Sequence, residues 1–300
     1  MASPALRPYA PGDETGIRLL FSQVHKRELS PETWCWRYRL NPAGESVVTV
    51  AVEDGEVVGH VGVLPMLVSG HAAGLWVDLM IRQDRRNLDL FLDMAQASLE
   101  ATERAGMEFV YAFPNDKSHP VLKRMLGWRT LREIDALEAP LRMLEAPTPA
   151  LKAEPFSAAG PEFDAFWESV RPKNALCAVR DAAWIRWRYL ERPGAPYACL
   201  KALSPSGGLA GWAALKVFDS GQGVIGDILD LWAPEPPASD ALWGATLTHF
   251  RSKGVTTVSS WAPGLPGLSP GGPRTHFAAH PRFCYDAGDW RVSKGDSDVF

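Results

Sequence analysis

The segment Trp36–Pro42, which reads Trp-Arg-Tyr-Arg-Leu-Asn-Pro, returns near the middle of the chain as Trp187–Pro193, which reads Trp-Arg-Tyr-Leu-Glu-Arg-Pro. Both segments share Trp-Arg-Tyr, then three residues, then a proline. The second copy begins 151 positions after the first, in a chain of 300 residues. Tryptophan is a rare residue, so such a match at mid-chain indicates a duplicated structural unit.

The residues around each copy follow one shared pattern. Ser30 and Asp181 are suited to cap the helices that carry the motif. An apolar stripe with helical spacing precedes both copies and predicts a surface helix in each half. Its members are Ile17, Leu20, Phe21 and Val24 in the first half, and Phe163, Phe166, Trp167 and Val170 in the second. After the motif, paired β-rich runs predict hairpins, at 48–53 with 56–64 and at 199–203 with 209–218.

A third strand, a long helix and a short strand complete each predicted unit. The third strands fall at 75–81 and 224–232, and the closing strands at 109–113 and 256–261. The helices between them end at Gly106 and Gly254, which suit C-terminal caps. We therefore predict an α/β (α+β) protein with two domains, each a mixed, mainly antiparallel sheet flanked by helices. The proline-containing stretch 145–154 separates a domain at 1–147 from a domain at 148–300.

Composition and charge restrict the class of protein. Hydrophobic residues make up 46% and charged residues 22%, which is typical of a soluble globular protein. The formal net charge of −4 provides no basic footprint for nucleic acid or for an anionic membrane surface. Sparse cysteines, no signal-peptide pattern and no run of about 20 apolar residues predict a cytoplasmic location.

The sequence predicts no metal site. The four cysteines lack metal-ligand spacing. His276 and His280 stand four positions apart, as two ligands on a helix would, but Pro281 and the glycines that precede them disfavour a helix. The stretch 263–273, rich in glycine and proline, is predicted to be an irregular loop.

The predicted order of elements resembles the GNAT (GCN5-related N-acetyltransferase) superfamily, well over residues 4–140 and more weakly over 150–300. The tandem pattern looks like bacterial two-domain GNAT proteins whose second half is degenerate. The resemblance implies transfer of an acetyl group from acetyl-coenzyme A, as co-substrate, to an amine. Val77–Ile81 looks like the family's fourth strand, which implies that the backbone of Leu79, Met80 and Ile81 contacts the pantetheine arm.

The stretch Asp84–Phe91 stands where the family has its pyrophosphate loop. The resemblance implies a phosphate site here, and the cofactor-binding residues it gives are Arg85, Arg86, Asn87, Leu88, Asp89, Leu90 and Phe91. Asn87 and Asp89 occupy two positions where the family has glycine. A carboxylate about 5 Å from a phosphate costs roughly 3 kcal/mol at an effective dielectric near 20, an effect that Arg85 and Arg86 could offset. Alternatively, Asn87 caps the next helix and Asp89 is a first-turn acid, so that side chains of the protein fill the anion site.

Candidate catalytic residues follow from the same resemblance. Asn115 matches a frequent family asparagine, and Leu126-Gly127-Trp128 looks like the turn before the sixth strand. Lys123 stands where many members have a tyrosine general acid, and His119 is an alternative proton donor. The candidate bases are Asp78, Glu53 and Asp116. Asp78 and its counterpart Asp230 also have a structural interpretation, since a residue kept in both halves is suited to hold the shared fold.

Two classes of function remain open at this stage. The leading hypothesis is an N-acyltransferase acting on a primary amine of a small molecule or a peptide, with Asp78, Asn115 and Lys123 as catalytic candidates. The alternative is a catalytically inactive GNAT-like binding or scaffolding module. Transfer of an aminoacyl group is a third possibility without a selecting motif. The second half has three prolines and no glycine or arginine at 233–240, so we expect it to lack a coenzyme A site, with Ser239 or Asp240 capping its long helix.

Overall fold

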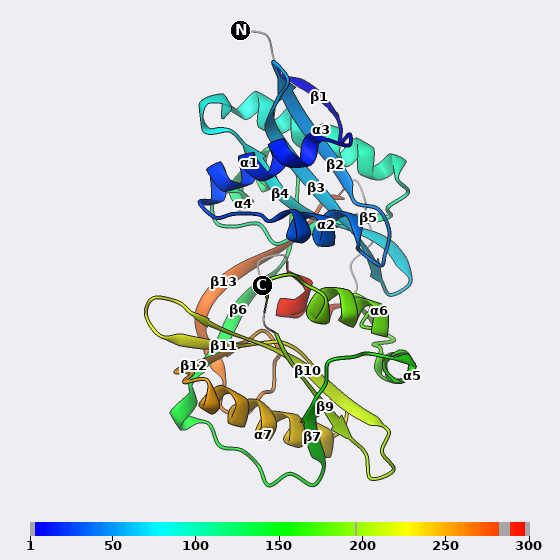
Figure 1. Ribbon diagram of the computed structural model, residues 1–300, viewed down its shortest axis with the longest axis vertical. Helices are drawn as coiled ribbons and strands as arrows, with labels where there is room; N and C mark the ends of the chain where they lie inside the picture. The colour runs from blue at the N-terminus through cyan, green and yellow to red at the C-terminus, as the bar shows by residue number, and fades with distance from the viewer. Residues whose placement is uncertain (1–3, 196, 282–288, 298–300) are drawn as a thin grey trace. The chain divides into compact units, whose positions relative to one another are not determined.

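The computed structural model describes residues 4–195, 197–281 and 289–297 (Figure 1). The chain divides into two compact units. The first unit runs to Arg132 and takes in the segment that starts at His276. The second unit comprises Glu133–Thr275 and the segment that starts at Gly288. The predicted division at 147/148 placed a single crossing in a proline-containing linker. Clustering of the contacts instead gives boundaries between the units at 132/133, 275/276 and 287/288.

The sheet of the first unit has the strand order β1-β2-β3-β4-β5-β13. Its pairs are antiparallel except for β4 with β5, which run parallel. The strands are β1 (Ala5–Pro8), β2 (Val47–Glu53), β3 (Glu56–Val68), β4 (His71–Ile81), β5 (Phe109–Ala112) and β13 (Ser269–Ala279), of which the part from His276 onward belongs to this unit. The helices are α1 (Asp13–His25), α2 (Pro31–Arg39), the 3-10 turn η1 (Gln83–Arg85), α3 (Leu88–Arg104) and α4 (His119–Met125).

Local sequence signals account for several of these boundaries. The turn between β2 and β3 has positive φ at both central residues, 50° at Asp54 and 81° at Gly55, the geometry that the right-handed twist of a two-residue hairpin favours. Helix α2 begins where the Ser30 side chain accepts a hydrogen bond from the Thr33 amide at 3.1 Å. The predicted hairpin and cap are therefore confirmed.

Strand β4 carries a bulge at Asp78. Val77 pairs with Gly62, but Met80 pairs with His60, so two residues of β4 face Val61 alone. Asp78 has a φ of 49°, a left-handed conformation typical of an interrupted ladder. Pairing with β5 ends at Leu75. In the described part of the chain, Trp76–Ile81 therefore has no strand paired to it on its β5 side.

The second unit repeats this plan with the strand order β6-β12-β11-β10-β9-β7. These strands are β6 (Arg129–Pro140), β7 (Lys152–Pro155), β9 (Ala198–Leu203), β10 (Leu209–Asp219), β11 (Val224–Trp232) and β12 (Thr257–Ser260). A separate pair is formed by β8 (Ala175–Leu176) and β14 (Asp289–Trp290). The helices are the 3-10 turn η2 (Leu141–Met143), α5 (Pro161–Val170), α6 (Ala182–Ile185) with the π-turn η3 (Arg186–Leu190), α7 (Pro236–Ser252) and the 3-10 turn η5 (Lys294–Asp296).

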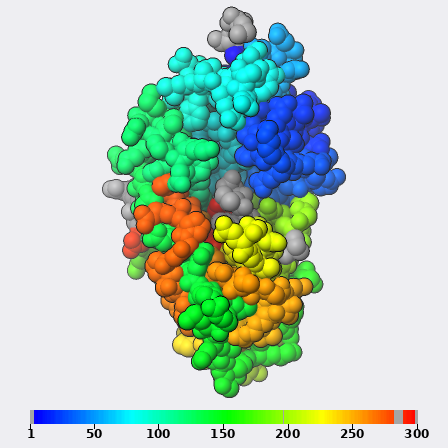
Figure 2. Space-filling view, turned by 90° about the vertical axis from the view of Figure 1, so that its left-hand side faces the viewer, coloured from blue at the N-terminus to red at the C-terminus, as the bar shows by residue number. Residues whose placement is uncertain are grey.

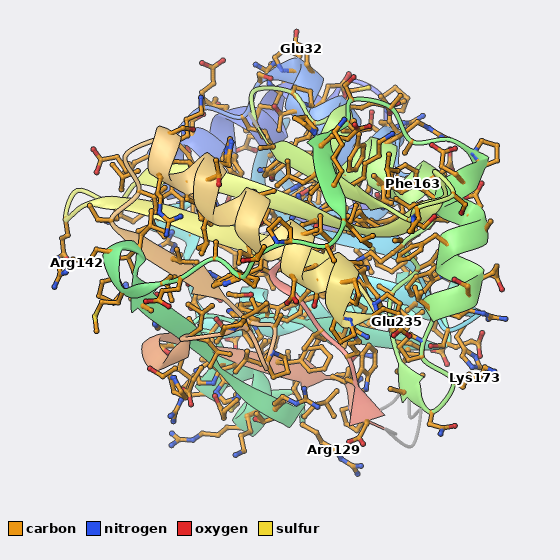
Figure 3. All side chains as sticks on the ribbon, turned by 90° about the horizontal axis from the view of Figure 1, so that it is seen from below. Glu32, Arg129, Arg142, Phe163, Lys173 and Glu235 are labelled. Atoms are coloured by element: carbon orange, nitrogen blue, oxygen red, sulfur yellow. The ribbon has the colours of Figure 1, made fainter. Side chains whose placement is uncertain are left out.

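The core of the second unit lies between its sheet and the helices that cover it. Phe163 of α5 is fully buried, and so are Leu242 and Phe250 of α7. Figure 3 shows Phe163 within α5 and Glu235 at the start of α7. Helices on a mixed, mainly antiparallel sheet recur in both units, so the structure confirms the predicted fold class.

Two local predictions were wrong. Residues 269–273 were expected in an irregular loop, but β13 begins at Ser269, and its first residues are largely exposed (orange in Figure 2). Helix α7 begins at Pro236 rather than after Ser239 or Asp240, and no side chain caps it. Proline is favoured in the first helical turn, where its missing N–H needs no partner, so the helix starts earlier than a polar cap would suggest.

No helix in the described residues is both long and apolar enough to cross a membrane.

Candidate active site

The Trp-Arg-Tyr motif of the first unit ties α2 to the bulge of β4. Tyr38 donates its hydroxyl to Oδ2 of Asp78 at 2.5 Å, and Nη1 of Arg37 donates to the same oxygen. Burial alone would raise the pKa of the Asp78 carboxyl, but the charge of Arg37 and the hydrogen bond from Tyr38 lower it. A buried carboxylate held between two donors serves as a structural tie. The structure therefore brings Asp78 to α2, and its role as a base stays a prediction.

His60 of β3 completes this tie and was not singled out in the sequence. Its ring nitrogen Nδ1 lies 2.9 Å from the backbone carbonyl oxygen of Asp78. Burial lowers the pKa of His60, which favours the neutral ring with Nδ1–H as the donor to that carbonyl. An isolated histidine in an apolar strand gives no sign that it supports a bulge 18 residues away.

The loop after β4 contains three arginines with different partners. Arg82 donates to Asp84 at 2.8 Å and to Glu56 at 2.8 Å. Arg85 donates to Glu53 at 2.5 Å, which engages the carboxylate that was a candidate base.

Arg86 uses Nε to donate to the carbonyl of Ile81 at 3.0 Å, and among the described residues no carboxylate forms an ion pair with it. Of the two arginines predicted to bind phosphate, Arg86 is the one whose charge is not already neutralised.

Asn87 is the N-cap of α3. Its side-chain oxygen accepts from the Leu90 amide at 2.8 Å, and its side-chain nitrogen donates to the carbonyl of Arg85 at 3.1 Å. Its φ of −147° is extended, so the backbone does not adopt the left-handed geometry that a glycine would allow. Asp89 is exposed in the first turn of α3. The capping interpretation is therefore confirmed at Asn87.

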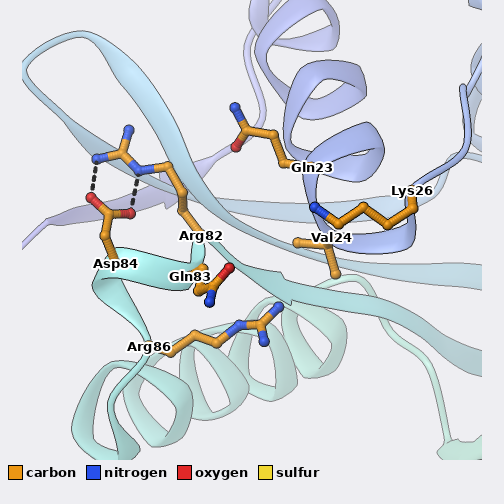
Figure 4. A pocket seen from close by; sticks show the side chains of 7 residues that line it. All are labelled: Gln23, Val24, Lys26, Arg82, Gln83, Asp84 and Arg86. Atoms are coloured by element: carbon orange, nitrogen blue, oxygen red, sulfur yellow. Dashed lines mark hydrogen bonds and ion pairs between the residues drawn. The ribbon is translucent and has the colours of Figure 1, made fainter.

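A cavity of about 700 Å³ lies between the end of α1 and the loop after β4 (Figure 4). In Figure 4 the side chains of Lys26 and Arg86 extend into this space, while Arg82 turns to Asp84. The cavity is lined by Gln23, Val24, Lys26, Arg82, Gln83, Asp84 and Arg86. Three cations against one carboxylate give the lining an excess of positive charge, which favours an anionic ligand. Lys26 was not predicted, because it follows a different helix.

The remaining cofactor candidates differ in exposure. Met80 and Ile81 are buried, and Leu79 is half-buried. Leu90, in the first turn of α3, is also buried. Leu88 and Phe91 flank the start of α3, and Leu88 is exposed. Leu79, Met80 and Ile81 lie on the stretch of β4 that passes the end of β5, so their backbone borders the unpaired side of that strand.

The predicted catalytic residues after β5 are arranged around α4. The side-chain oxygen of Asn115 accepts from the amides of Lys117 and Ser118, each at 3.0 Å, which forms the turn that starts α4. Lys123 is exposed in the last turn of α4.

His119 and Asp116 come together with His276, a residue of β13. The His119 and His276 rings are stacked with centroids 3.8 Å apart, and Nε2 of His276 lies 2.9 Å from Oδ1 of Asp116. His280, by contrast, packs against Trp128. The sequence analysis named these three residues separately but did not bring them together, because residues 269–273 were expected in an irregular loop and not in β13.

The second unit repeats the tie but changes one partner. Tyr189 donates to Oδ2 of Asp230 at 2.5 Å, as Tyr38 does to Asp78. Arg180 takes the place of the motif arginine and donates to Asp230 at 3.0 Å. The motif arginine Arg188 instead donates to the carbonyl oxygens of Gly295 and Ser297, each at 3.0 Å.

Residues 294–297 are buried beside the second half of β11. Lys294 donates to Asp227 of β11 and, at 2.7 Å, to the hydroxyl of Ser259 on β12. A Cβ atom on Gly295 would lie 2.2 Å from the Tyr189 hydroxyl and 2.3 Å from Asp230. Parallel pairing of β11 with β12 ends at Ile228. Residues 294–297 therefore fill the space beside β11. The corresponding space in the first unit is the unpaired side of β4.

Comparisons with known proteins give matches by structure. Neither a protein-family model nor a curated protein matches the chain by sequence. A GCN5-related N-acetyltransferase from Anabaena variabilis superposes with a TM-score of 0.71 at 14% identity, over 92% of this chain and 72% of that chain. A conserved protein from Enterococcus faecalis described as a probable N-acyltransferase gives 0.70 at 13% identity, over 93% and 72%.

A third match covers more than nine-tenths of both chains. A tandem GNAT protein from the clavulanic acid biosynthesis pathway superposes with a TM-score of 0.61 at 15% identity, over 92% of this chain and 97% of that chain. Identities this low show the fold alone, and the mainly antiparallel sheet flanked by helices in each unit agrees with it. The chain therefore has the GNAT fold of the GCN5-related N-acetyltransferases, as its repeated sequence pattern predicted.

Proposed function

We propose that this protein is an N-acyltransferase that transfers an acyl group, in the first instance acetyl from acetyl-coenzyme A, to a primary amine. The observation that carries this proposal is the unpaired side of β4 at Trp76–Ile81, which leads directly into the cationic cavity lined by Lys26 and Arg86. A side of a strand on which the described residues pair no further strand suits an extended amide chain, and a cationic cavity at its end suits phosphates.

Two groups of residues fit two parts of the acetyl-coenzyme A molecule. The backbone of Leu79, Met80 and Ile81 would hold the pantetheine arm, and Lys26 and Arg86 would pair with its phosphates. The start of α3 follows this loop directly, and the dipole of a helix N-terminus favours an anion there. The exposed Asp89 carboxylate opposes phosphate binding, so we expect modest donor affinity. The bound co-substrate supplies an activated thioester.

The protein's own groups would orient the reaction and move protons. Asp78 positions β4 through Arg37 and Tyr38, and Asn115 positions the start of α4, so both act through other groups. Lys123 remains our predicted proton donor. The acceptor is a primary amine on a small molecule or a peptide, and we place the reaction in the cytoplasm.

We assign donor binding to the first unit alone. In the second unit Lys294 and Gly295 fill the space beside β11, and Arg188 is bound to the carbonyls of that same segment. A donor there would have to displace buried charged groups, which is costly. One donor molecule should bind per chain.

Isothermal titration with acetyl-coenzyme A tests the proposal. We expect Arg86→Gln to raise the Kd by roughly ten- to a hundredfold, since loss of one charge-assisted hydrogen bond costs on the order of 1.5–3 kcal/mol. Arg85→Gln is the matched control, because Glu53 already neutralises Arg85 at 2.5 Å, and it should change the Kd less than threefold. Equal effects of the two changes would contradict phosphate binding at Arg86, and no binding of the native chain at millimolar donor would contradict the proposal as a whole.

A second candidate, an inactive GNAT-like binding module, is favoured by one observation. Asn87 caps α3 with its own side chain and thereby uses a donor group that the phosphate-binding loop needs. Under this candidate, Asn87→Gly combined with Asp89→Gly should create donor binding that the native chain lacks. Turnover of acetyl-coenzyme A by the native chain in the presence of an amine excludes it.

A further inference from the structure

Exposed basic residues are concentrated between the end of β5 and the start of β6. Residues 115–132 contain five lysines and arginines but a single acid, Asp116, whose carboxylate lies 2.9 Å from Nε2 of His276. This excess stands out in a chain whose formal net charge is −4. The whole segment belongs to the first unit. Its surface is therefore more positive than the composition of the chain suggests.

Four of these cations share one region and are called the basic cluster: Lys117, Lys123, Arg124 and Arg132. Nε2 of His119 lies 2.8 Å from the Thr130 hydroxyl, so the start of α4 is held against β6. Lys123 follows His119 by one helical turn and shares its side of α4. Arg132 shares the side of β6 that Thr130 occupies, because strand side chains alternate.

The side chains of the basic cluster are available to a partner. All four residues are exposed, and in the described part of the chain none of them forms an ion pair with a carboxylate. Met125, next to Arg124, is 49% exposed and adds an apolar surface. Cations gathered without counter-charges create a positive potential, which favours an anionic partner.

The basic cluster adjoins the place where β4 and β5 separate. Pairing of β4 with β5 ends at Leu75, and the ring of the next residue, Trp76, packs on Trp128 with centroids 5.4 Å apart. Trp128 joins α4 to β6, and its amide donates to the carbonyl of Leu122 at 3.2 Å. The cationic cavity proposed for the phosphates of the donor begins beyond Ile81, roughly 16 Å further along β4. The cluster therefore adjoins the end of β4 at which the acyl group would lie.

We propose that the acceptor is a peptide whose free amine is followed by acidic side chains, and that the basic cluster binds those side chains. This inference rests on the proposed acyl transfer and names the class of its acceptor. Cations spread over a turn, a helix and a strand suit several carboxylates along an extended chain better than one small anion. A nucleic acid fits less well, because the chain as a whole is acidic, with a sequence pI of about 6.0.

The transfer needs no further reactant. The amine nitrogen forms a C–N bond to the acetyl carbon, the C–S bond of the thioester breaks, and the proton lost by the amine leaves on the thiol of coenzyme A. The basic cluster forms none of these bonds and holds the acceptor by charge. It should therefore lower the KM for the acceptor rather than raise kcat.

Acetyl transfer to two synthetic peptides tests the proposal. Both carry a free N-terminal amine, followed by four glutamates in one and four glutamines in the other. At low salt we expect a KM about tenfold lower for the glutamate peptide, and a smaller difference in about 0.5 M NaCl, because salt screens exposed charges. Arg124→Glu combined with Arg132→Glu should abolish this preference and leave turnover of the glutamine peptide unchanged. Lys123 is kept, because it is the predicted proton donor.

Arg104→Glu is the matched control. It reverses the charge of another exposed arginine of the first unit, at the end of α3. From there the chain passes to the start of β5, whereas α4 follows the end of that strand. This variant should keep the native preference for the glutamate peptide to within about twofold.

Fluorescence anisotropy of peptides labelled at the C-terminus measures acceptor binding without turnover. Equal binding of both peptides by the native chain, or an equal loss of preference in Arg104→Glu, overturns the acidic acceptor, as does tighter binding of a single-stranded oligonucleotide. The proposed acyl transfer then still stands if acetyl-coenzyme A binds in isothermal titration. Absence of donor binding contradicts the acyl transfer itself, and the acidic acceptor with it.

Discussion

The hydroxyl of Tyr38 lies 2.5 Å from Oδ2 of Asp78. The second unit contains the same bond at the same distance, between Tyr189 and Asp230. In both units it joins the helix that carries the Trp-Arg-Tyr motif to the third strand of the repeat. The motif is therefore retained twice because it secures the fold, while the arginine within it has taken different partners.

Removal of either tyrosine hydroxyl should destabilise the protein. We expect Tyr38→Phe and Tyr189→Phe each to lower the free energy of unfolding by about 1–3 kcal/mol, because a buried carboxylate loses a donor. The control is Tyr9→Phe, whose hydroxyl bonds to Glu14 at 3.1 Å nearer the surface. Urea unfolding measures all three, and a loss as large in Tyr9→Phe would argue against the buried ties.

The contribution of Asp78 should depend on pH. Although burial opposes it, the Arg37 charge and the Tyr38 hydrogen bond hold the pKa of Asp78 below that of the unfolded chain, about 3.9. Its stabilising effect is therefore present above about pH 4 and is lost as the pH falls through the folded-state pKa.

The difference in unfolding free energy between the native protein and Asp78→Asn tests this dependence. It should be constant from pH 7 to pH 5 and shrink towards pH 3. Other carboxylates titrate in both proteins and cancel in the difference. A difference that grows on acidification would show that the sign is wrong.

Gly295 should tolerate no side chain. A Cβ atom would meet the Tyr189 hydroxyl at 2.2 Å and Asp230 at 2.3 Å, so we expect Gly295→Ala to cost more than about 2 kcal/mol of stability. Gly244→Ala is the contrasting control, because it lies inside α7 with 3.8 Å to its nearest neighbour. That change should stabilise by about 0.5–1 kcal/mol. Thermal unfolding distinguishes the two signs.

The buried thiols should resist alkylation. Burial raises the pKa of Cys177 and of Cys199 to about 12. Almost no thiolate then exists at pH 8, and the thiolate is the reactive form. Iodoacetamide should modify both residues at least a hundredfold more slowly in the native protein than in urea, as peptide mass spectrometry can follow residue by residue. Similar rates in both conditions would show that these segments open readily.

Much of the fold could be predicted because its signals are local. The cap at Ser30, the turn at Asp54-Gly55 and the cap at Asn87 each depend on residues within a few positions of one another. The repeat then supplied the order of elements for the second half. Local periodicity does not specify which distant strand pairs with which, so the partner of β5 was not predicted.

The candidate site could be predicted from the sequence only where its residues are contiguous along the chain. The stretch Leu79–Ile81 and the loop with Arg86 were found because they are contiguous. Lys26 was missed because it reaches the cavity through tertiary packing. Pro270 and Pro273 gave β13 the composition of a loop, although proline is compatible with the exposed part of a strand.

The repeated crossing of the chain between its two units also bears on its evolutionary history. After a gene duplication, each copy would at first have been complete on its own. Here the first unit needs the strand residues from His276 onward, and the second begins with residues of β6 that follow Arg132 directly. A fragment that stops at mid-chain would leave the edge of β5 uncovered and open to association with other chains. No single cut of the chain therefore yields two fragments that each hold one whole unit.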